Sequence, residues 1–424
     1  MVHISGDAVL AAFAEVDRAI ASEHSTDPLE AQPQTHNWEV WGLDRSERGI
    51  PVPNLNNVML VWAKDPYFRG KVWYDEFLQR VMMEDYPGAI PREWTGADAV
   101  RTAIYFQRVI GITAMQTKIV KEAVMAVCAK DIRNCLKDWL DQLQWDGRPR
   151  IWNFFPEYCG APNTAYTRAV SKNFFLTLIA RAIRRGSKVD NVVVLEGEEG
   201  LKKSSMFECL GGDWFFTQHG DINQNQFFEN LQGKWIVEIA EMDAFSRAET
   251  TRVYSVITTR SDRYRVPYEP YPADHPRSCV FVGTTNKDTW SNSETGGRRW
   301  WPIRCRGHID VDAISRIREQ LFAEAMHEFT REAKWWLMPE DETKIEQSAR
   351  YQVDERNDMV EAWLLGKNRI TVAEIMEECL KFDRSRIGSK AEQMSVGRML
   401  AHLGWQKKIE RNGDTTRRFW ERGR

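Results

Sequence analysis

The sequence predicts a multidomain α/β protein, in which a parallel-sheet core lies between a mainly helical N-terminal region and a C-terminal module of helices and a hairpin. The chain has 424 residues, enough for about three domains of roughly 150 residues each. A continuous β-branched run at 192–197 is typical of a strand buried in a parallel sheet, and residues 234–241 and 278–286 are further strand candidates. Helical segments separate these strands, as in an α/β sheet. The C-terminal end has two helical patterns followed by an alternating hairpin pattern.

The overall composition is that of an ordinary globular protein. Hydrophobic residues make up 42% and charged residues 28% of the chain, which excludes a disordered or collagen-like protein. The seven cysteines form no C-x-x-C pair and the eight histidines have no metal-ligand spacing, so we expect reduced thiols and no zinc. The sequence has neither a run of about 18 apolar residues nor a signal-peptide pattern, so we expect a cytoplasmic protein with no membrane partner.

The first part of the chain is predicted to be helical. Residues 7–21 have an apolar period of about 3.6 and predict an amphipathic helix, which a polar, proline-containing linker follows at 22–37. Residues 57–143 predict a mainly helical domain. The helical stretches expected there are Tyr74–Met83, Ala97–Ile110 and Thr117–Ala129.

The core and the C-terminal module follow in order. Residues 164–185 predict a long amphipathic helix that stops at Gly186, and residues 311–335 predict another helix after the strands. The C-terminal module has helical patterns and then a hairpin with a turn at Asn412, Gly413 and Asp414, an order that suggests a winged helix. The expected domains are residues 1–50, 51–163, 164–340 and 345–424.

A glycine-containing turn follows the first apolar strand and opens a helix. Its outer frame is that of the phosphate-binding loop G-x-x-x-x-G-K-[ST], with Lys202 in place of the second glycine. Backbone N–H groups there attract phosphate, Lys203 would reach the β and γ oxygens of ATP, and Ser204 would bind Mg²⁺. The alternative is a strand-to-helix turn with two incidental lysines. The candidate residues are Gly197, Glu198, Glu199, Gly200, Leu201, Lys202, Lys203, Ser204 and Ser205.

The second apolar strand contains acidic residues, which are costly in such a strand unless they meet a cation. We predict that Glu241, at its end, orients the attacking water and supports Mg²⁺, with Glu238 as the second candidate for both roles. The alternative is that both acids pair with nearby Arg or Lys residues.

Polar residues follow the third strand. Asn286 is expected at the same carboxyl edge of the sheet, as a sensor of the γ-phosphate, or else as the cap of a turn. Arg298 and Arg299 are candidates for an arginine finger supplied across a subunit boundary, or for a salt-bridged turn.

Two basic segments predict contact with nucleic acid. Residues 258–278 interleave arginines with tyrosines, as in a hairpin that binds a single strand; the alternative is a proline-rich surface loop. Residues 395–424 contain eight Lys or Arg against three acids, although the whole chain has a net charge of only −3. The DNA-binding candidates are Arg263, Arg265, Tyr268, Lys407, Lys408, Arg417 and Arg418.

These motifs, in this order from about Asn54 to the C-terminus, resemble the virulence-associated protein E family of phage and mobile-element ATPases related to superfamily 3 helicases. The resemblance implies an AAA+-like P-loop ATPase core and a homo-oligomeric ring, as a hexamer, that moves along single-stranded or forked DNA in a bacterial cell and works with a separate primase. It implies a Walker A pair (Lys203, Ser204), Walker B acids (Glu238, Glu241), a sensor (Asn286) and a finger (Arg298 or Arg299).

Three functions are compatible with the pattern. The first is an ATP-dependent DNA helicase or translocase that replicates a phage, prophage or mobile element. The second is a replication initiator or helicase loader in which ATP only gates DNA binding. The third is a structural protein with a degenerate loop, which the joint occurrence of the motifs disfavours.

Overall fold

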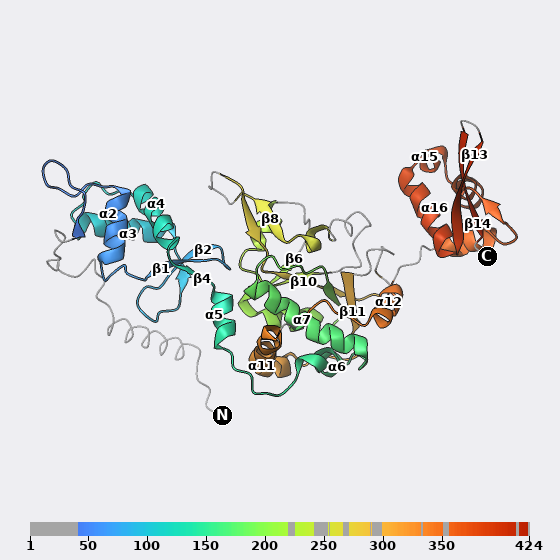
Figure 1. Cartoon of the computed structure of the whole chain (residues 1–424), viewed down its shortest axis with the longest axis horizontal. Helices are drawn as coiled ribbons and strands as arrows, with labels where there is room; N and C mark the ends of the chain where they lie inside the picture. Colours follow the sequence, from blue (N-terminus) through green and yellow to red (C-terminus); the bar gives the residue numbers. More distant parts are fainter. Residues whose placement is uncertain are drawn as a thin grey trace, which may run out of the picture.

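The structure is a computed structural model, and Figure 1 shows its helices and strands coloured in sequence order. The predicted helix at 7–21 and linker at 22–37 lie outside the described residues. Among the described residues, no helix is both long and apolar enough to cross a membrane. The described residues are 41–218, 225–240, 253, 255–265, 271–288, 290, 299–331, 334–350, 356–412 and 415–422.

The N-terminal part is mainly helical, as predicted, but it also contains a small sheet that the sequence did not predict. Its strands pair in the order β3-β2-β1-β4, and its helices pack around a core of their own. The elements are α2 (Leu55–Lys64), β1 (Val72–Asp75), β2 (Arg80–Met83), β3 (Arg92–Glu93), α3 (Gly96–Arg108), α4 (Thr117–Cys128), β4 (Ile132–Arg133) and α5 (Cys135–Gln142).

The segment predicted as a helix at Tyr74–Met83 is instead the hairpin of β1 and β2. Asp75 Oδ1 accepts hydrogen bonds from the backbone N–H groups of Phe77 (2.9 Å) and Leu78 (2.8 Å). Gln79 completes the reversal with a positive φ of 56°. The aspartate thus offers the backbone a turn in place of the helix. The predicted helices at 97–110 and 117–129 are confirmed as α3 and α4.

A parallel sheet forms the centre of the molecule, which confirms the α/β prediction. Its strand order is β11-β5-β10-β7-β6, so β10 lies between β5 and β7 and the carboxyl ends of all three meet at one edge. Every neighbouring pair in this sheet is parallel. The strands are β5 (Val192–Glu196), β6 (Phe215–Gln218), β7 (Ile236–Ile239), β10 (Val280–Thr285) and β11 (Trp300–Arg304).

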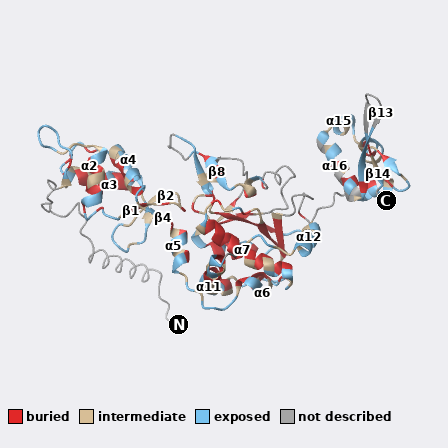
Figure 2. Ribbon diagram, in the orientation of Figure 1, coloured by how far each residue is buried: buried red, intermediate tan, exposed pale blue. Residues whose placement is uncertain are grey.

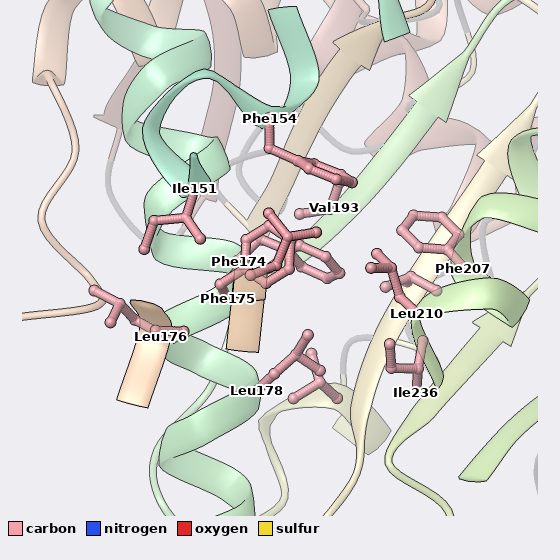
Figure 3. Close-up of a cluster of buried hydrophobic side chains, with 14 of the residues drawn as sticks. Ile151, Phe154, Phe174, Phe175, Leu176, Leu178, Val193, Phe207, Leu210 and Ile236 are labelled. Atoms are coloured by element: carbon pink, nitrogen blue, oxygen red, sulfur yellow. The ribbon is translucent and has the colours of Figure 1, made fainter. Parts of the chain in front are cut away.

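The long helix α7 (Ala165–Ile183) fills the space on one face of this sheet. It was predicted to be amphipathic, but most of its residues are buried, because elements close over it on several sides. Its Phe174 and Phe175 lie among Val193 of β5, Phe207 of the next helix and Ile236 of β7 (Figure 3). Figure 2 shows that buried residues concentrate in this central body.

Further helices and a separate hairpin surround the sheet. The helix predicted at 311–335 is confirmed as α11, which packs against α7. Strands β8 and β9 form a two-stranded antiparallel sheet of their own. The elements are η2 (Ile151–Asn153), α6 (Phe154–Cys159), α8 (Lys203–Gly211), η3 (Gly212–Trp214), α9 (Asn225–Asn230), β8 (Ser261–Tyr264), β9 (Ala273–Pro276), α11 (Val311–Thr330) and α12 (Glu340–Ser348).

The C-terminal part has the predicted order of helix, helix and hairpin, around a separate core. A short strand joins the hairpin to give the sheet β12-β14-β13. Gly413 and Asp414 of the predicted turn lie outside the described residues. The elements are α13 (Arg356–Trp363), β12 (Arg369–Ile370), α14 (Val372–Glu374), a π-helical turn (Ile375–Cys379), α15 (Arg384–Ile387), α16 (Lys390–His402), β13 (Trp405–Asn412) and β14 (Thr415–Arg422).

Candidate functional site

The predicted phosphate-binding loop connects β5 to α8 at the carboxyl edge of the sheet. Gly197 and Gly200 have positive φ angles of 145° and 82°. A Cβ on Gly197 would lie 2.9 Å from Leu201 Cδ1 and 3.0 Å from the Cys305 carbonyl oxygen, so this position requires glycine. Lys202, the N-cap of α8, has a φ of 63°, which is the left-handed conformation that glycine adopts freely. The backbone therefore keeps the turn of the motif although the second glycine is absent.

Lys203 lies inside this loop and is buried. Its ammonium group donates to the carbonyl oxygens of Gly197 (2.8 Å) and Glu198 (2.7 Å). It also donates to Asn286 Oδ1 at 2.8 Å, so the two predicted residues meet, although they come from different strand ends. Burial lowers the pKa of Lys203 from its usual value.

Glu238 of β7 is completely buried beside the loop. Its Oε1 accepts hydrogen bonds from Ser204 Oγ (2.6 Å) and Thr284 Oγ1 (2.7 Å), and its Oε2 accepts one from Thr217 Oγ1 (3.3 Å). Within the described part of the chain its partners are hydroxyl groups rather than the Arg or Lys of the alternative interpretation. Sequence reasoning missed Thr217 and Thr284. Thr217 pairs in register with Glu238, but this signal appears only once the strand order is known.

The residues at this edge fit a magnesium-bound triphosphate. Among the described residues, the backbone N–H groups of Glu198, Glu199, Gly200 and Lys202 have no hydrogen-bond acceptor, and they precede the nine-residue helix α8. Unpaired N–H groups at a helix N-terminus attract phosphate oxygens. A buried carboxylate satisfied only by hydroxyl groups favours a cation nearby, and Ser204 and Glu238 would hold it.

Of the other predicted catalytic residues, the structure places only Arg299, which does not join this cluster. Glu241 and Arg298 lie outside the described residues. Arg299 immediately precedes β11, whose first residue, Trp300, pairs with Val192 at the start of β5. Arg299 therefore lies at the opposite edge of the sheet from the loop of its own chain.

Two of the predicted DNA-binding arginines are exposed at β8 of the β8–β9 hairpin. Arg263 is exposed and forms an ion pair with Asp274 of β9 at 3.1 Å. Arg265 is exposed directly after β8, and Tyr271 before β9 is 79% exposed. Tyr268 lies outside the described residues.

Two residues of the same basic segment are structural. Tyr264 is buried and stacks on His275, with ring centroids 4.2 Å apart. Arg277 is buried and forms a double hydrogen bond to Asp262, at 2.6 Å for each N–O pair. These contacts fix the base of the hairpin, and so neither side chain is available for stacking or phosphate binding.

The predicted C-terminal contacts lie on the β13–β14 hairpin. Lys407 and Lys408 of β13 and Arg418 of β14 are exposed. Arg418 pairs across the strands with Ile409, which is 61% exposed. Arg417 belongs to β14, but its side chain lies outside what the structure describes.

Two solved apo structures of the NrS-1 C-terminal region are similar to the chain, each at 12% identity. One covers 83% of this chain and 96% of its own, with a TM-score of 0.47; the other covers 87% and 100%, with a TM-score of 0.48. A search of curated proteins finds no match. The model of the virulence-associated protein E-like domain matches residues 140–354, which is half of the sequence. The protein therefore belongs to the virulence-associated protein E-like family.

Proposed function

We propose that the protein is an ATP-dependent DNA helicase or translocase that acts in the replication of a phage, prophage or mobile element. One observation carries the proposal. Lys203, Ser204, Asn286 and Glu238 come from three strand ends and converge at the carboxyl edge of the sheet. Ligands of open parallel sheets bind at this edge. The third interpretation, a structural protein with a degenerate loop, does not account for a buried lysine and a buried glutamate in two sets of hydrogen bonds that the consecutive residues Lys203 and Ser204 bring side by side.

The chain's own residues divide the work of ATP hydrolysis. Magnesium-bound ATP supplies the phosphoryl group and the cation. Lys203 exchanges its carbonyl contacts for phosphate oxygens, and Ser204 with Glu238 holds the cation. Glu241 orients the attacking water, while Asn286 senses the γ-phosphate.

Hydrolysis is proposed to take place between subunits of a ring. In this scheme Arg298 or Arg299 acts on the site of the neighbouring subunit, because an arginine finger works across a boundary. The position of Arg299 at the far edge of its own sheet supports this arrangement. A hexamer is the proposed assembly.

DNA is the proposed partner, as a single strand or a fork, and a separate primase is the proposed second partner. The helix–helix–hairpin part is proposed to be a winged helix, with Lys407, Lys408 and Arg418 exposed on its hairpin. Arg263 and Arg265 on the β8–β9 hairpin supply a second basic surface. Contacts of this kind predict an affinity for DNA that falls steeply with salt. The bacterial cytoplasm is the proposed location.

The test is the Lys203→Ala variant. This variant removes the ammonium group that would bind the phosphate oxygens. We expect DNA-stimulated ATP hydrolysis to fall at least about 100-fold, as when one preorganised donor is lost. The matched control is Lys344→Ala, which removes an exposed lysine paired with Glu340. Hydrolysis that persists in Lys203→Ala contradicts the site. Strand displacement on a forked DNA, measured with the wild-type protein, separates a helicase from an initiator or loader that hydrolyses ATP without unwinding.

A further inference from the structure

A buried ion pair lies directly behind the phosphate-binding loop. Glu196, the last residue of β5, is 1% exposed and immediately precedes Gly197. Its carboxylate accepts hydrogen bonds from Arg350 Nε (2.9 and 3.0 Å) and Arg350 Nη2 (2.9 Å). It also accepts one from the indole N–H of Trp290 at 2.8 Å. None of these three residues takes part in the proposed chemistry.

The backbone ties the same three segments together. The N–H of Trp290 donates to the carbonyl oxygen of Arg350 at 3.2 Å, and the N–H of Cys305 donates to the carbonyl oxygen of Glu196 at 2.8 Å. Trp290 comes four residues after Asn286. The Glu196 carboxylate therefore joins three segments: the end of α12, the segment after β10 and the start of the loop.

The choice of residues at this junction indicates more than packing. A buried ion pair is often no more stabilising than apolar side chains of similar volume, because both charges lose their hydration. The pair instead fixes the orientation of the carboxylate, because the planar guanidinium group holds it through more than one hydrogen bond. The orientation of the Glu196 carboxylate matters because the segments joined to it carry Lys203 and Asn286, whose side chains form a hydrogen bond of 2.8 Å.

We propose that Arg350 and Trp290 are positioning residues of the nucleotide site: through Glu196 they hold the segment that carries Asn286 against the start of the phosphate-binding loop. The proposal deepens the proposed function and rests on it for its catalytic consequence. Neither residue contacts the loop's phosphate-facing groups, so their effect is on geometry and therefore on turnover.

Two conservative variants test this. Trp290→Phe keeps a ring next to Trp300, whose ring centroid lies 5.6 Å away, but removes the N–H that reaches Glu196. Arg350→Lys keeps the charge but loses the planar double contact. Lys344→Ala is the control, because it removes an exposed ion pair from α12, the helix that precedes Arg350.

The first measurement is hydrogen exchange of the backbone amides of residues 286–288 in the protein without nucleotide. Both variants are expected to exchange there about tenfold faster than wild type, the effect of losing one hydrogen bond to a charged group, while the control is unchanged. The second measurement is steady-state ATP hydrolysis. We expect kcat to fall about tenfold with KM within about threefold of wild type, because the loop itself is intact.

Unchanged exchange at 286–288 in both variants overturns the proposal. A uniform rise in hydrogen exchange over the whole sheet, with the same loss of binding of a fluorescent ATP analogue in both variants, also overturns the proposal. That outcome would mean that the ion pair only stabilises the fold. If the wild type and Lys344→Ala hydrolyse no ATP, the proposed function fails, while the exchange measurement still decides whether Arg350 and Trp290 position this segment.

Discussion

Lys202 gives a quantitative test of the loop geometry. Its φ of 63° and ψ of 33° place it in the left-handed region, which costs a residue with a Cβ roughly 1–2 kcal/mol. Glycine removes this strain, but its greater freedom in the unfolded chain costs about 0.4–1 kcal/mol. Lys202→Gly is therefore expected to raise the free energy of unfolding by about 0.5–1 kcal/mol.

Differential scanning calorimetry measures this difference. For a domain of about 150–250 residues, 1 kcal/mol corresponds to a Tm shift of about 2–4 °C, so we expect the transition of the sheet domain to rise by about 1–4 °C. Lys202→Ala is the matched control, because it removes the same charged side chain and keeps the Cβ. Lys381→Gly is a second control, since Lys381 has a similar φ of 54° in the C-terminal part. It is expected to leave the transition of the sheet domain unchanged.

The reasoning is refuted if Lys202→Gly lowers the Tm of the sheet domain, or if Lys202→Ala raises it by the same amount. In the first case the left-handed conformation is not strained for lysine. In the second case the gain comes from removing a positive charge next to Lys203, so backbone geometry does not explain it.

Two further predictions concern stability. Arg277→Ala leaves the buried Asp262 carboxylate without its partner and is expected to lower the free energy of unfolding, measured by urea denaturation, by about 3–5 kcal/mol. Arg263→Ala breaks an exposed pair and is expected to lower it by no more than about 1 kcal/mol. Equal losses in the two variants contradict this reasoning. Gly233→Ala places a Cβ 2.9 Å from Leu78 Cδ2 at a φ of 65°, so it is expected to lower stability by about 1–3 kcal/mol, and by more than Gly366→Ala, where the φ is 80° and the space is open.

The sheet and the centre of the site could be predicted from the sequence because each depends on a continuous segment. The segments that form β5, β7 and β10 are short and mostly apolar, and a residue with a candidate chemical role follows or occupies each of them. Lys203 and Asn286 can therefore be predicted as site residues from the sequence, without knowledge of the contact between them. Glu238 was ranked second to Glu241, since the sequence shows that an acid lies in a strand but not which neighbours its side chain meets.

The parts of the site that the sequence did not predict depend on contacts between segments that are distant in the chain. Thr217 and Thr284 reach Glu238 only because β6 and β10 lie on either side of β7, and no local pattern gives that order. Arg350 is equally remote from Glu196 in the chain. The helix expected at Tyr74–Met83 does not form for the opposite reason, since the Asp75 carboxylate accepts local hydrogen bonds from the backbone that compete with a helix.

The central position of β10 also has a consequence for how the protein is made. During synthesis β5, β6 and β7 leave the ribosome well before β10, the strand that separates β5 from β7. Until β10 arrives, β7 is paired only with β6, and β5 has no partner on either edge because β11 also follows β10 in the chain. Such unpaired edges are templates for pairing with other chains. Fragments that stop before Val280 are therefore expected to aggregate, and the two sides of the proposed nucleotide site can form only as a late, long-range step of folding.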